Sequence, residues 1–195
     1  MRPVDLARLR SFVRHVDDFP SKGVRFLDVT HVISNPELFA FIIDALARPF
    51  LERGVTHVMA LEARGFYFAG AVALRLQAGL VPVRKPGKLP PRTINAKGFI
   101  ADGDGIIQSS DALKSGFNTY QKPYEFELAE GVLRSGSRIV VVDDLLAKGG
   151  SIDSCRKLVA KTEAEIVGAA VVIELSALGG RANLTGIEIT SIIEY

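Results

Sequence analysis

Apolar residues are spaced along this chain in two alternating ways. Short continuous apolar runs predict buried strands, and apolar residues three or four positions apart predict helices with one buried face. The predicted strands cover residues 56–61, 80–83, 139–142, 167–175 and 188–193. The predicted helices cover residues 1–14, 36–48, 66–76 and 152–159. Because strands alternate with helices, we expect an α/β fold with a central, mostly parallel sheet flanked by helices on both faces.

Residues 90–123 break this regular alternation. The segment is rich in glycine, serine, aspartate and lysine, with Gly98, Gly103, Gly105 and Gly116 spread through it. It predicts a long mobile loop without regular secondary structure. Loops of this length in compact domains serve as lids or binding loops, or are plain surface insertions, and both interpretations fit this composition.

Composition limits the classes of protein to which the chain can belong. Its 195 residues fit one domain, residues 1–195, and its net charge of +2 gives no argument for binding nucleic acid or an anionic membrane. No apolar run approaches the roughly 20 residues of a membrane-spanning helix. Asp5, Asp17 and Asp18 argue against a targeting peptide. The single Cys155 leaves no disulfide within the chain and predicts a packing role in a reducing, cytoplasmic compartment.

The densest chemical signal lies in residues 139–151. Four β-branched residues predict a central strand, and Asp143 and Asp144 follow where such a strand delivers ligand-binding groups. Adjacent carboxylates accept hydrogen bonds from vicinal hydroxyls, and Gly149 and Gly150 let backbone N–H groups face an anion at the start of the next helix. The run therefore predicts a ribose-phosphate site. The alternative is a solvated acidic turn whose glycines only permit positive φ angles.

Two further turns carry cations. Residues 61–66 follow a strand and precede a helix, and Arg64 there offers a bidentate donor for phosphate oxygens. A basic turn, residues 84–88, follows the next strand, and its three cations suit a pyrophosphate. Taken alone, such a charge run is typical of a solvated loop. Together with the acidic run, the turns predict subsites for a diol, a 5′-phosphate and a pyrophosphate, which phosphoribosyl pyrophosphate combines in one molecule.

Four segments of the chain match a known family in order and spacing. They are residues 19–28, 61–66, 81–90 and 141–151. On these segments the chain resembles the adenine branch of the type I phosphoribosyltransferases, and Arg-Lys-Pro-Gly-Lys-Leu-Pro at residues 84–90 is the most specific of the shared motifs. The similarity covers most of residues 12–90 and 136–175. It implies the type I phosphoribosyltransferase fold, with a small N-terminal hood region at residues 1–35 and a mobile loop at residues 90–123.

This resemblance implies roles for individual residues. Asp143 and Asp144 correspond to residues that bind the ribose hydroxyls, and the glycine turn, residues 147–151, corresponds to the loop around the 5′-phosphate. Val24 and Phe26 correspond to residues that cover the adenine ring, although ordinary core packing is the alternative for Phe26. The implied phosphoribosyl pyrophosphate site comprises Glu62, Ala63, Arg64, Arg84, Lys88, Asp143, Asp144, Ala147, Lys148, Gly149, Gly150 and Ser151.

The resemblance also implies the reaction, in which adenine and phosphoribosyl pyrophosphate give AMP and pyrophosphate for purine salvage. Arg64 and Lys88 are the implied catalytic cations on the leaving pyrophosphate. Glu127 is the candidate for proton transfer at the base. In an alignment without gaps, however, Tyr120 takes the place of the family's glutamate and Glu127 falls in the following strand. A plain strand glutamate that faces solvent is therefore the alternative.

Mg²⁺ is the implied cofactor. It prefers phosphate oxygens and water to protein ligands, so we expect it on the substrate and expect no protein metal site. Arg84 and Lys88 correspond to residues that in some family members reach pyrophosphate across a dimer interface, which implies a homodimer. The implied partners are adenine, phosphoribosyl pyrophosphate and AMP, with no nucleic acid and no membrane.

Two residues depart from the family pattern. Leu27 stands where the family usually has an arginine beside the adenine site, and Lys148 replaces the threonine of the glycine turn. Lys148 can offer its charge to the 5′-phosphate, or point away and leave binding to backbone N–H groups. These departures keep two other interpretations open: a non-catalytic sensor or partner subunit that binds phosphoribosyl pyrophosphate or a nucleotide, and a transferase for another purine base. A DNA-binding regulator normally adds a basic recognition element, which this sequence lacks.

Overall fold

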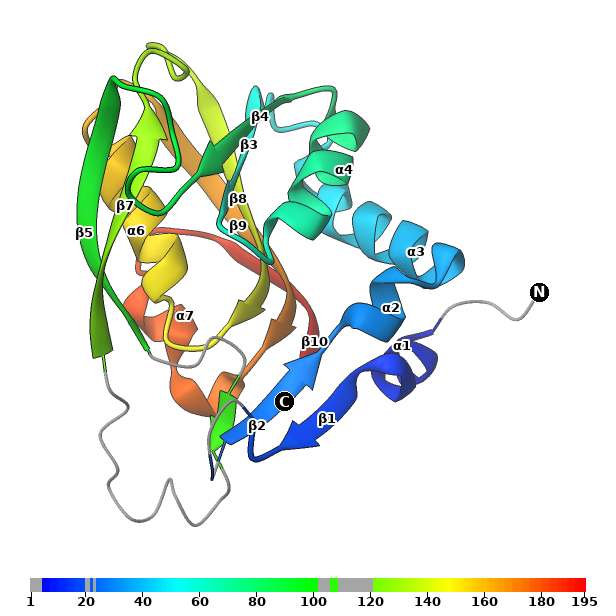
Figure 1. Cartoon of the computed structure of the whole chain (residues 1–195). Helices are drawn as coiled ribbons and strands as arrows, with labels where there is room; N and C mark the ends of the chain where they lie inside the picture. The colour runs from blue at the N-terminus through cyan, green and yellow to red at the C-terminus, as the bar shows by residue number, and fades with distance from the viewer. Residues whose placement is uncertain (1–4, 20–21, 23, 102–105, 109–120) are drawn as a thin grey trace.

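The centre of the fold is a five-stranded parallel sheet (Figure 1). The structure, a computed structural model, describes residues 5–19, 22, 24–101, 106–108 and 121–195. The strand order is β10-β9-β8-β3-β4, and every neighbouring pair is parallel. The strands are β3 (His57–Leu61), β4 (Gly79–Val83), β8 (Arg138–Leu146), β9 (Glu165–Glu174) and β10 (Ile189–Glu194). The strands predicted from apolar runs are therefore confirmed, although their ends differ by a few residues.

Helices cover both faces of this sheet, with α3 and α4 on one side and α6 on the other. Val140 and Val142 of β8 pack on the α3 and α4 side, whereas Ile139 and Val141 pack with α6. Successive strand residues point to opposite faces, so a continuous apolar run indicates a strand that is buried on both. Cys155 of α6 is buried among the apolar residues between α6 and the sheet, which confirms its predicted packing role.

The predicted start of α3 is confirmed. The Asn35 side-chain oxygen accepts hydrogen bonds from the backbone N–H groups of Glu37 and Leu38, both at 3.1 Å, and Pro36 occupies the first helical position. These contacts satisfy N–H groups that have no partner within the helix.

No helix among the described residues is long and apolar enough to cross a membrane. The helices on the sheet and before it are α2 (Thr30–Ile33), α3 (Pro36–Ala47), η1 (Arg48–Phe50), α4 (Phe66–Leu76) and α6 (Gly150–Val159).

The N-terminal region forms a small antiparallel sheet beside the main one. β2 pairs with β1 on one side and with β6, from a distant part of the sequence, on the other. The prediction of a helix over residues 1–14 is wrong beyond Phe12, and residues 1–4 lie outside the described residues. Val13 is extended yet buried, so the apolar spacing continues past the end of the helix. These elements are α1 (Leu6–Phe12), β1 (Arg14–Asp17), β2 (Val24–Asp28) and β6 (Ile106–Gln108).

A long β-hairpin occupies much of the segment that was predicted to be an irregular loop. β5 (Thr93–Ala101) and β7 (Gln121–Ala129) form an antiparallel ladder along their whole length. The prediction for residues 90–123 is therefore wrong for these strands and for β6, whereas residues 102–105 and 109–120 lie outside the described residues.

The strands of the hairpin were not predicted because each is buried on one face only. Ala96, Phe126 and Leu128 are buried and pack with α6, whereas Asn95 and Lys97 are exposed. Because only one face of the hairpin is covered, the apolar residues alternate with polar ones and form no continuous run.

Candidate active site

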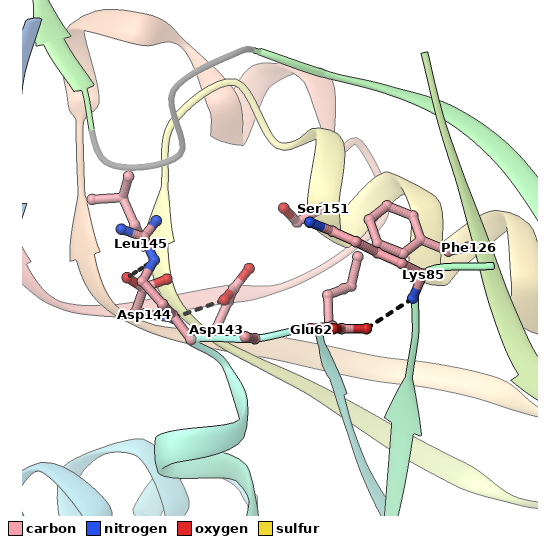
Figure 2. Close-up of a pocket in the computed structure, with 10 residues that line it drawn as sticks. Glu62, Lys85, Phe126, Asp143, Asp144, Leu145 and Ser151 are labelled. Atoms are coloured by element: carbon pink, nitrogen blue, oxygen red, sulfur yellow. Dashed lines mark hydrogen bonds and ion pairs between the residues drawn. The ribbon is translucent and has the colours of Figure 1, made fainter. Parts of the chain in front are cut away.

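The carboxyl ends of β3, β4 and β8 meet at one edge of the sheet, where a pocket lies beside the start of α6 (Figure 2). Ligand-binding groups of parallel sheets gather at this edge. β8 is longer than predicted, because its pairing with β9 continues to Leu146, so the two aspartates lie within the strand and not after it. The residues that line the pocket are Leu61, Glu62, Ala63, Arg64, Lys85, Phe126, Asp143, Asp144, Leu145 and Ser151.

The carboxylate pair is almost wholly buried, with 7% of Asp143 and 4% of Asp144 exposed. The backbone N–H of Asp144 donates to Asp143 Oδ1 at 3.0 Å, and Arg64 Nε lies 3.0 Å from Asp144 Oδ2. Burial raises the pKa of Asp144 because the charged carboxylate loses its hydration, and the Arg64 guanidinium opposes this shift. Burial of both groups excludes the alternative of a solvated acidic turn.

Arg64 connects the pocket to the N-terminal sheet. Its guanidinium carbon lies 5.2 Å from the centre of the Phe26 ring, a cation–π distance. The Phe19 ring meets Phe26 edge-on, with 5.3 Å between centroids. Phe26 thus lies next to a pocket residue, and its role in covering the adenine ring stays a prediction. The side chain of Val24, the other predicted base-covering residue, lies outside the described part of the structure.

Gly65 lets the turn after β3 approach β8 closely. A Cβ at this position would lie 2.9 Å from the carbonyl oxygen of Val142 and 3.0 Å from Asp143 Oδ1. Contacts this short require the strand or the carboxylate to shift. The glycine is therefore required by space and not by its backbone angles, since its φ is −55°.

Glu62 joins the turn after β3 to the basic turn. Its Oε2 accepts hydrogen bonds from Arg84 Nε and from the backbone N–H of Lys85, each at 3.0 Å, and Figure 2 shows the second contact. The hydrogen bond from Arg84 and that from the Lys85 backbone lower the pKa of Glu62. Lys88 is exposed and does not belong to the described residues that line the pocket.

Glu127 lies in β7, beside the basic turn. It exchanges two backbone hydrogen bonds with Arg84, and its Oε2 accepts a third from the N–H of Gly87 at 3.1 Å. Its neighbour Phe126 lines the pocket. The strand position fits the ungapped alignment, while Tyr120 lies outside the described residues. The role of Glu127 in proton transfer stays a prediction.

The glycine turn brings the start of α6 to the carboxylates. Gly149 has a φ of +85°, which a residue with a side chain rarely adopts, and α6 begins at Gly150. Ser151, in the first turn of α6, lines the same pocket as both aspartates. N–H groups at a helix start favour an anion such as a phosphate. The structure therefore brings together the two parts of the predicted ribose-phosphate site.

Four residues that line the pocket, Leu61, Lys85, Phe126 and Leu145, are absent from the list of residues implied for the substrate site, and only Phe126 lies outside the segments that predicted the site. Phe126 stands between Glu125 and Glu127, and this alternation of apolar and charged residues is the signal that could have identified a half-buried strand. Leu145 was assigned to a turn because the apolar run ends at the aspartates.

Comparison with known proteins identifies the family. A model of the phosphoribosyl transferase domain matches residues 29–183, which include the carboxylate pair, the glycine turn and both cationic turns. The chain belongs to the phosphoribosyltransferase family. The family resemblance inferred from the four segments is thereby confirmed.

Members of this family resemble the chain over nearly its whole length. The adenine phosphoribosyltransferase of Aeromonas salmonicida is 38% identical, with 100% of this chain and 98% of that protein covered. That of Rhodopirellula baltica is 36% identical, with 100% and 85% covered. The solved structure of the Thermoanaerobacter pseudethanolicus enzyme is 34% identical with a TM-score of 0.84, covering 98% of this chain and 100% of that one. The Saccharomyces cerevisiae enzyme, solved with adenine and an imino-altritol bisphosphate, is 32% identical with a TM-score of 0.78, covering 95% and 97%. The predicted type I phosphoribosyltransferase fold is confirmed.

Proposed function

We propose that this chain transfers the 5-phosphoribosyl group from phosphoribosyl pyrophosphate to adenine, giving AMP and pyrophosphate in purine salvage. The observation that carries the proposal is the single pocket at which the buried carboxylate pair, the glycine turn and the turn after β3 meet. Relatives that are 36–40% identical over at least 95% of this chain are named adenine phosphoribosyltransferase, which supports the same activity.

In this proposal the pocket divides the substrate into three parts. Asp143 and Asp144 accept hydrogen bonds from the ribose hydroxyls, because they are the buried acceptors of the pocket. The 5′-phosphate lies at the start of α6, where backbone N–H groups are available. The pyrophosphate lies toward the cations. The glycine turn contributes Ala147, Lys148, Gly149, Gly150 and Ser151, and the pyrophosphate subsite comprises Glu62, Ala63, Arg64, Arg84 and Lys88.

Substrate binding then requires two ion pairs to exchange partners. Arg64 is paired with Asp144 and Arg84 with Glu62, both at 3.0 Å. A guanidinium binds carboxylate and phosphate oxygens with the same geometry, so pyrophosphate can replace each carboxylate. Movement of Arg64 to pyrophosphate would release Asp144 for the ribose hydroxyls.

The reaction breaks one bond at ribose C1 and forms another. The bond between ribose C1 and a pyrophosphate oxygen breaks with its electron pair passing to pyrophosphate, and adenine N9 forms the new bond to C1 and loses its proton. Negative charge that develops on pyrophosphate is stabilised by Arg64, Arg84 and Lys88. Glu127 is the candidate acceptor of the proton, for which its carboxylate would have to leave the N–H of Gly87.

Mg²⁺ fits this site as an ion held mainly by the substrate. Among the described residues, no group of three or more His, Cys, Asp or Glu side chains is arranged to hold a metal. Mg²⁺ is commonly bound through phosphate oxygens, water and one or two carboxylates, and Asp143 and Asp144 are carboxylates of the pocket. When bound, it would neutralise charge on the leaving pyrophosphate.

A homodimer is part of the proposal, and an apolar patch on α4 and β4 supports it. Tyr67 and Leu74 lie on one face of α4 and are 51% and 82% exposed. Leu80 of β4 is 46% exposed and lies beside Gly70 on the same face. Contiguous exposed apolar residues are typical of protein interfaces. Because β4 leads directly into the basic turn, an interface on this patch would bring Lys88 near a partner subunit.

A transferase for another purine base is the second candidate, and Leu27 motivates it. Leu27 is 2% exposed and belongs to the core cluster, whereas the adjacent Phe26 contacts Arg64. The side chain at position 27 therefore lies on the opposite face of β2 from the pocket. The guanidinium that the family usually has beside the adenine site is thus missing here, which leaves the preferred base open.

One assay tests both candidates. The purified chain is incubated with phosphoribosyl pyrophosphate, Mg²⁺ and adenine, with hypoxanthine, guanine and xanthine in parallel reactions, and nucleotide formation is followed. We expect AMP from adenine at the highest kcat/KM. Preferred turnover of another base would establish the second candidate. Saturable binding of phosphoribosyl pyrophosphate without turnover of any base would contradict both and indicate a sensor or partner subunit.

A further inference from the structure

The segment that follows β9 packs against the carbonyl groups of the glycine turn. This segment contains η2 (Ser176–Leu178) and α7 (Gly180–Asn183). A Cβ on Gly180 would lie 2.2 Å from the carbonyl oxygen of Ala147, so only glycine permits this approach. At the other end of α7, Asn183 Nδ2 donates a hydrogen bond to the carbonyl oxygen of Lys148 at 3.1 Å.

These two contacts determine how two peptide planes of the turn are oriented. In a trans peptide, the carbonyl group and the N–H group of the next residue point in opposite directions. Because the carbonyl groups of Ala147 and Lys148 point toward α7, the N–H groups of Lys148 and Gly149 point away from it. Peptide orientation in the glycine turn therefore depends on the position of α7.

α7 is itself held by Arg181. Its Nε donates to Glu174 Oε1 at 3.1 Å, and its Nη1 donates to the carbonyl oxygen of Ile189 at 2.6 Å. Glu174 is 5% exposed and ends β9, where it pairs with Leu146, the residue before the glycine turn. The same two strands thus support both α7 and the turn.

Leu184, the residue after α7, contacts the glycine turn at Gly149. It is 1% exposed, and its side chain lies where a Cβ on Gly149 would meet it at 2.9 Å. Each of the residues 147–149 is therefore in contact with the segment that follows β9.

We propose that α7 sets the orientation of the glycine turn and that Asn183 is a positioning residue for the 5′-phosphate end of the substrate. The inference rests on the proposed function, which assigns the glycine turn to that phosphate. Asn183 acts through the carbonyl group of Lys148 and does not touch the substrate.

The variant Asn183→Ala tests this proposal in the full chain. Asn183 is exposed, so its truncation removes the hydrogen bond without opening the core. We expect the affinity for ribose 5-phosphate to fall about 2- to 10-fold, the loss that accompanies one neutral hydrogen bond. The affinity for inorganic pyrophosphate should not change, because in the proposed function this ligand binds to Arg64 and Arg84. Calorimetric titration with each ligand measures the two affinities.

A backbone readout and a matched control separate positioning from general destabilisation. In the ligand-free protein, the amide resonances of Lys148 and Gly149 should shift in Asn183→Ala and not in Ala182→Ser, which changes the neighbouring exposed position of α7. The control variant should bind both ligands as the wild type does.

Two results would overturn the inference while the proposed function stands: an equal loss of affinity for both ligands, or wild-type affinity for ribose 5-phosphate in Asn183→Ala. A wild-type protein that binds no ribose 5-phosphate would overturn the proposed function itself, and this inference with it.

Discussion

Asp144 affects stability in a way that follows from its place in the site. Burial raises its pKa, so the folded protein binds the Asp144 proton more tightly than the unfolded chain does. The free energy of unfolding therefore falls as the pH rises from the ordinary value of 3.8 toward the raised pKa, and the loss is complete above it. The Arg64 guanidinium limits this loss but does not cancel it.

Asp144→Asn should raise the free energy of unfolding at neutral pH and weaken binding of phosphoribosyl pyrophosphate. The amide carries no charge that burial could destabilise, yet it no longer offers a carboxylate to the ribose hydroxyls. Urea unfolding at a series of pH values measures the first effect, and substrate titration measures the second.

Asp153→Asn is a control of opposite sign. Burial acts to raise the pKa of Asp153, but hydrogen bonds from Lys157 and Arg156 outweigh it, so the pKa is lowered. Its contribution to stability is present above 3.8 and is lost as the pH falls, and its amide variant should be less stable at neutral pH. A change of the same sign in both variants would contradict this account of Asp144.

Glu127→Gln separates proton transfer from support of the basic turn. Glutamine keeps an oxygen that can accept the hydrogen bond from Gly87, but it cannot take a proton at neutral pH. We expect kcat to fall about 100-fold with little change in KM. Glu125→Gln, two positions earlier in β7, is the control and should leave kcat unchanged. A wild-type kcat in Glu127→Gln would show that the carboxylate only supports the basic turn and does not transfer a proton.

Sequence analysis located those parts of the site whose residues are consecutive in the chain. The aspartates and the glycine turn belong to one run, so their proximity required no knowledge of the fold. Phe126 reaches the pocket from a distant hairpin, and its contact depends on packing that no local pattern records. Lys88 was assigned to the site by resemblance, but this residue is exposed and is not among the described residues that line the pocket.

At the scale of elements, the close approach between the turn after β3 and β8 can be tested with two glycines. Gly65→Ala should lower the free energy of unfolding by about 1–3 kcal/mol, the usual cost of overpacking, because its Cβ would meet Val142 and Asp143. Gly70→Ala is the matched control within α4: its Cβ would lie 4.0 Å from Leu80, and alanine favours a helix interior by about 0.5–1 kcal/mol. Equal effects measured by chemical unfolding would argue against the close approach.

The strands with the longest apolar runs in the sequence are those buried on both sides. β3, β8 and β9 have continuous apolar runs because helices cover both faces of the sheet. β1 is mostly exposed and has no such run. β5 has no such run either, because only one of its faces is buried. Its partner β7 also lies beyond an intervening segment of the chain. Pairing across such a distance is a property of the fold and leaves little local signal.

At the scale of the whole molecule, the patch on α4 and β4 predicts the state of association. The wild-type chain should sediment as a dimer, and Leu74→Glu should sediment as a monomer, because Leu74 is 82% exposed and a buried unpaired carboxylate destabilises an interface. Val132→Glu, at an exposed apolar residue after β7, is the control and should remain dimeric. If the wild-type chain is a monomer at assay concentration, the proposal that this patch forms a dimer interface is wrong.

The ion pairs of the pocket have a further consequence for how substrate is recognised. Three carboxylates, those of Glu62, Asp143 and Asp144, lie beside three cations, those of Arg64, Arg84 and Lys85. These groups alone are close to electroneutral before the polyanion arrives, and the further cations of the proposed site, Lys88 and Lys148, are not among the described residues that line the pocket. Selection between phosphoribosyl pyrophosphate and other anions must then occur on contact, where a ligand has to replace particular carboxylates at particular guanidinium groups.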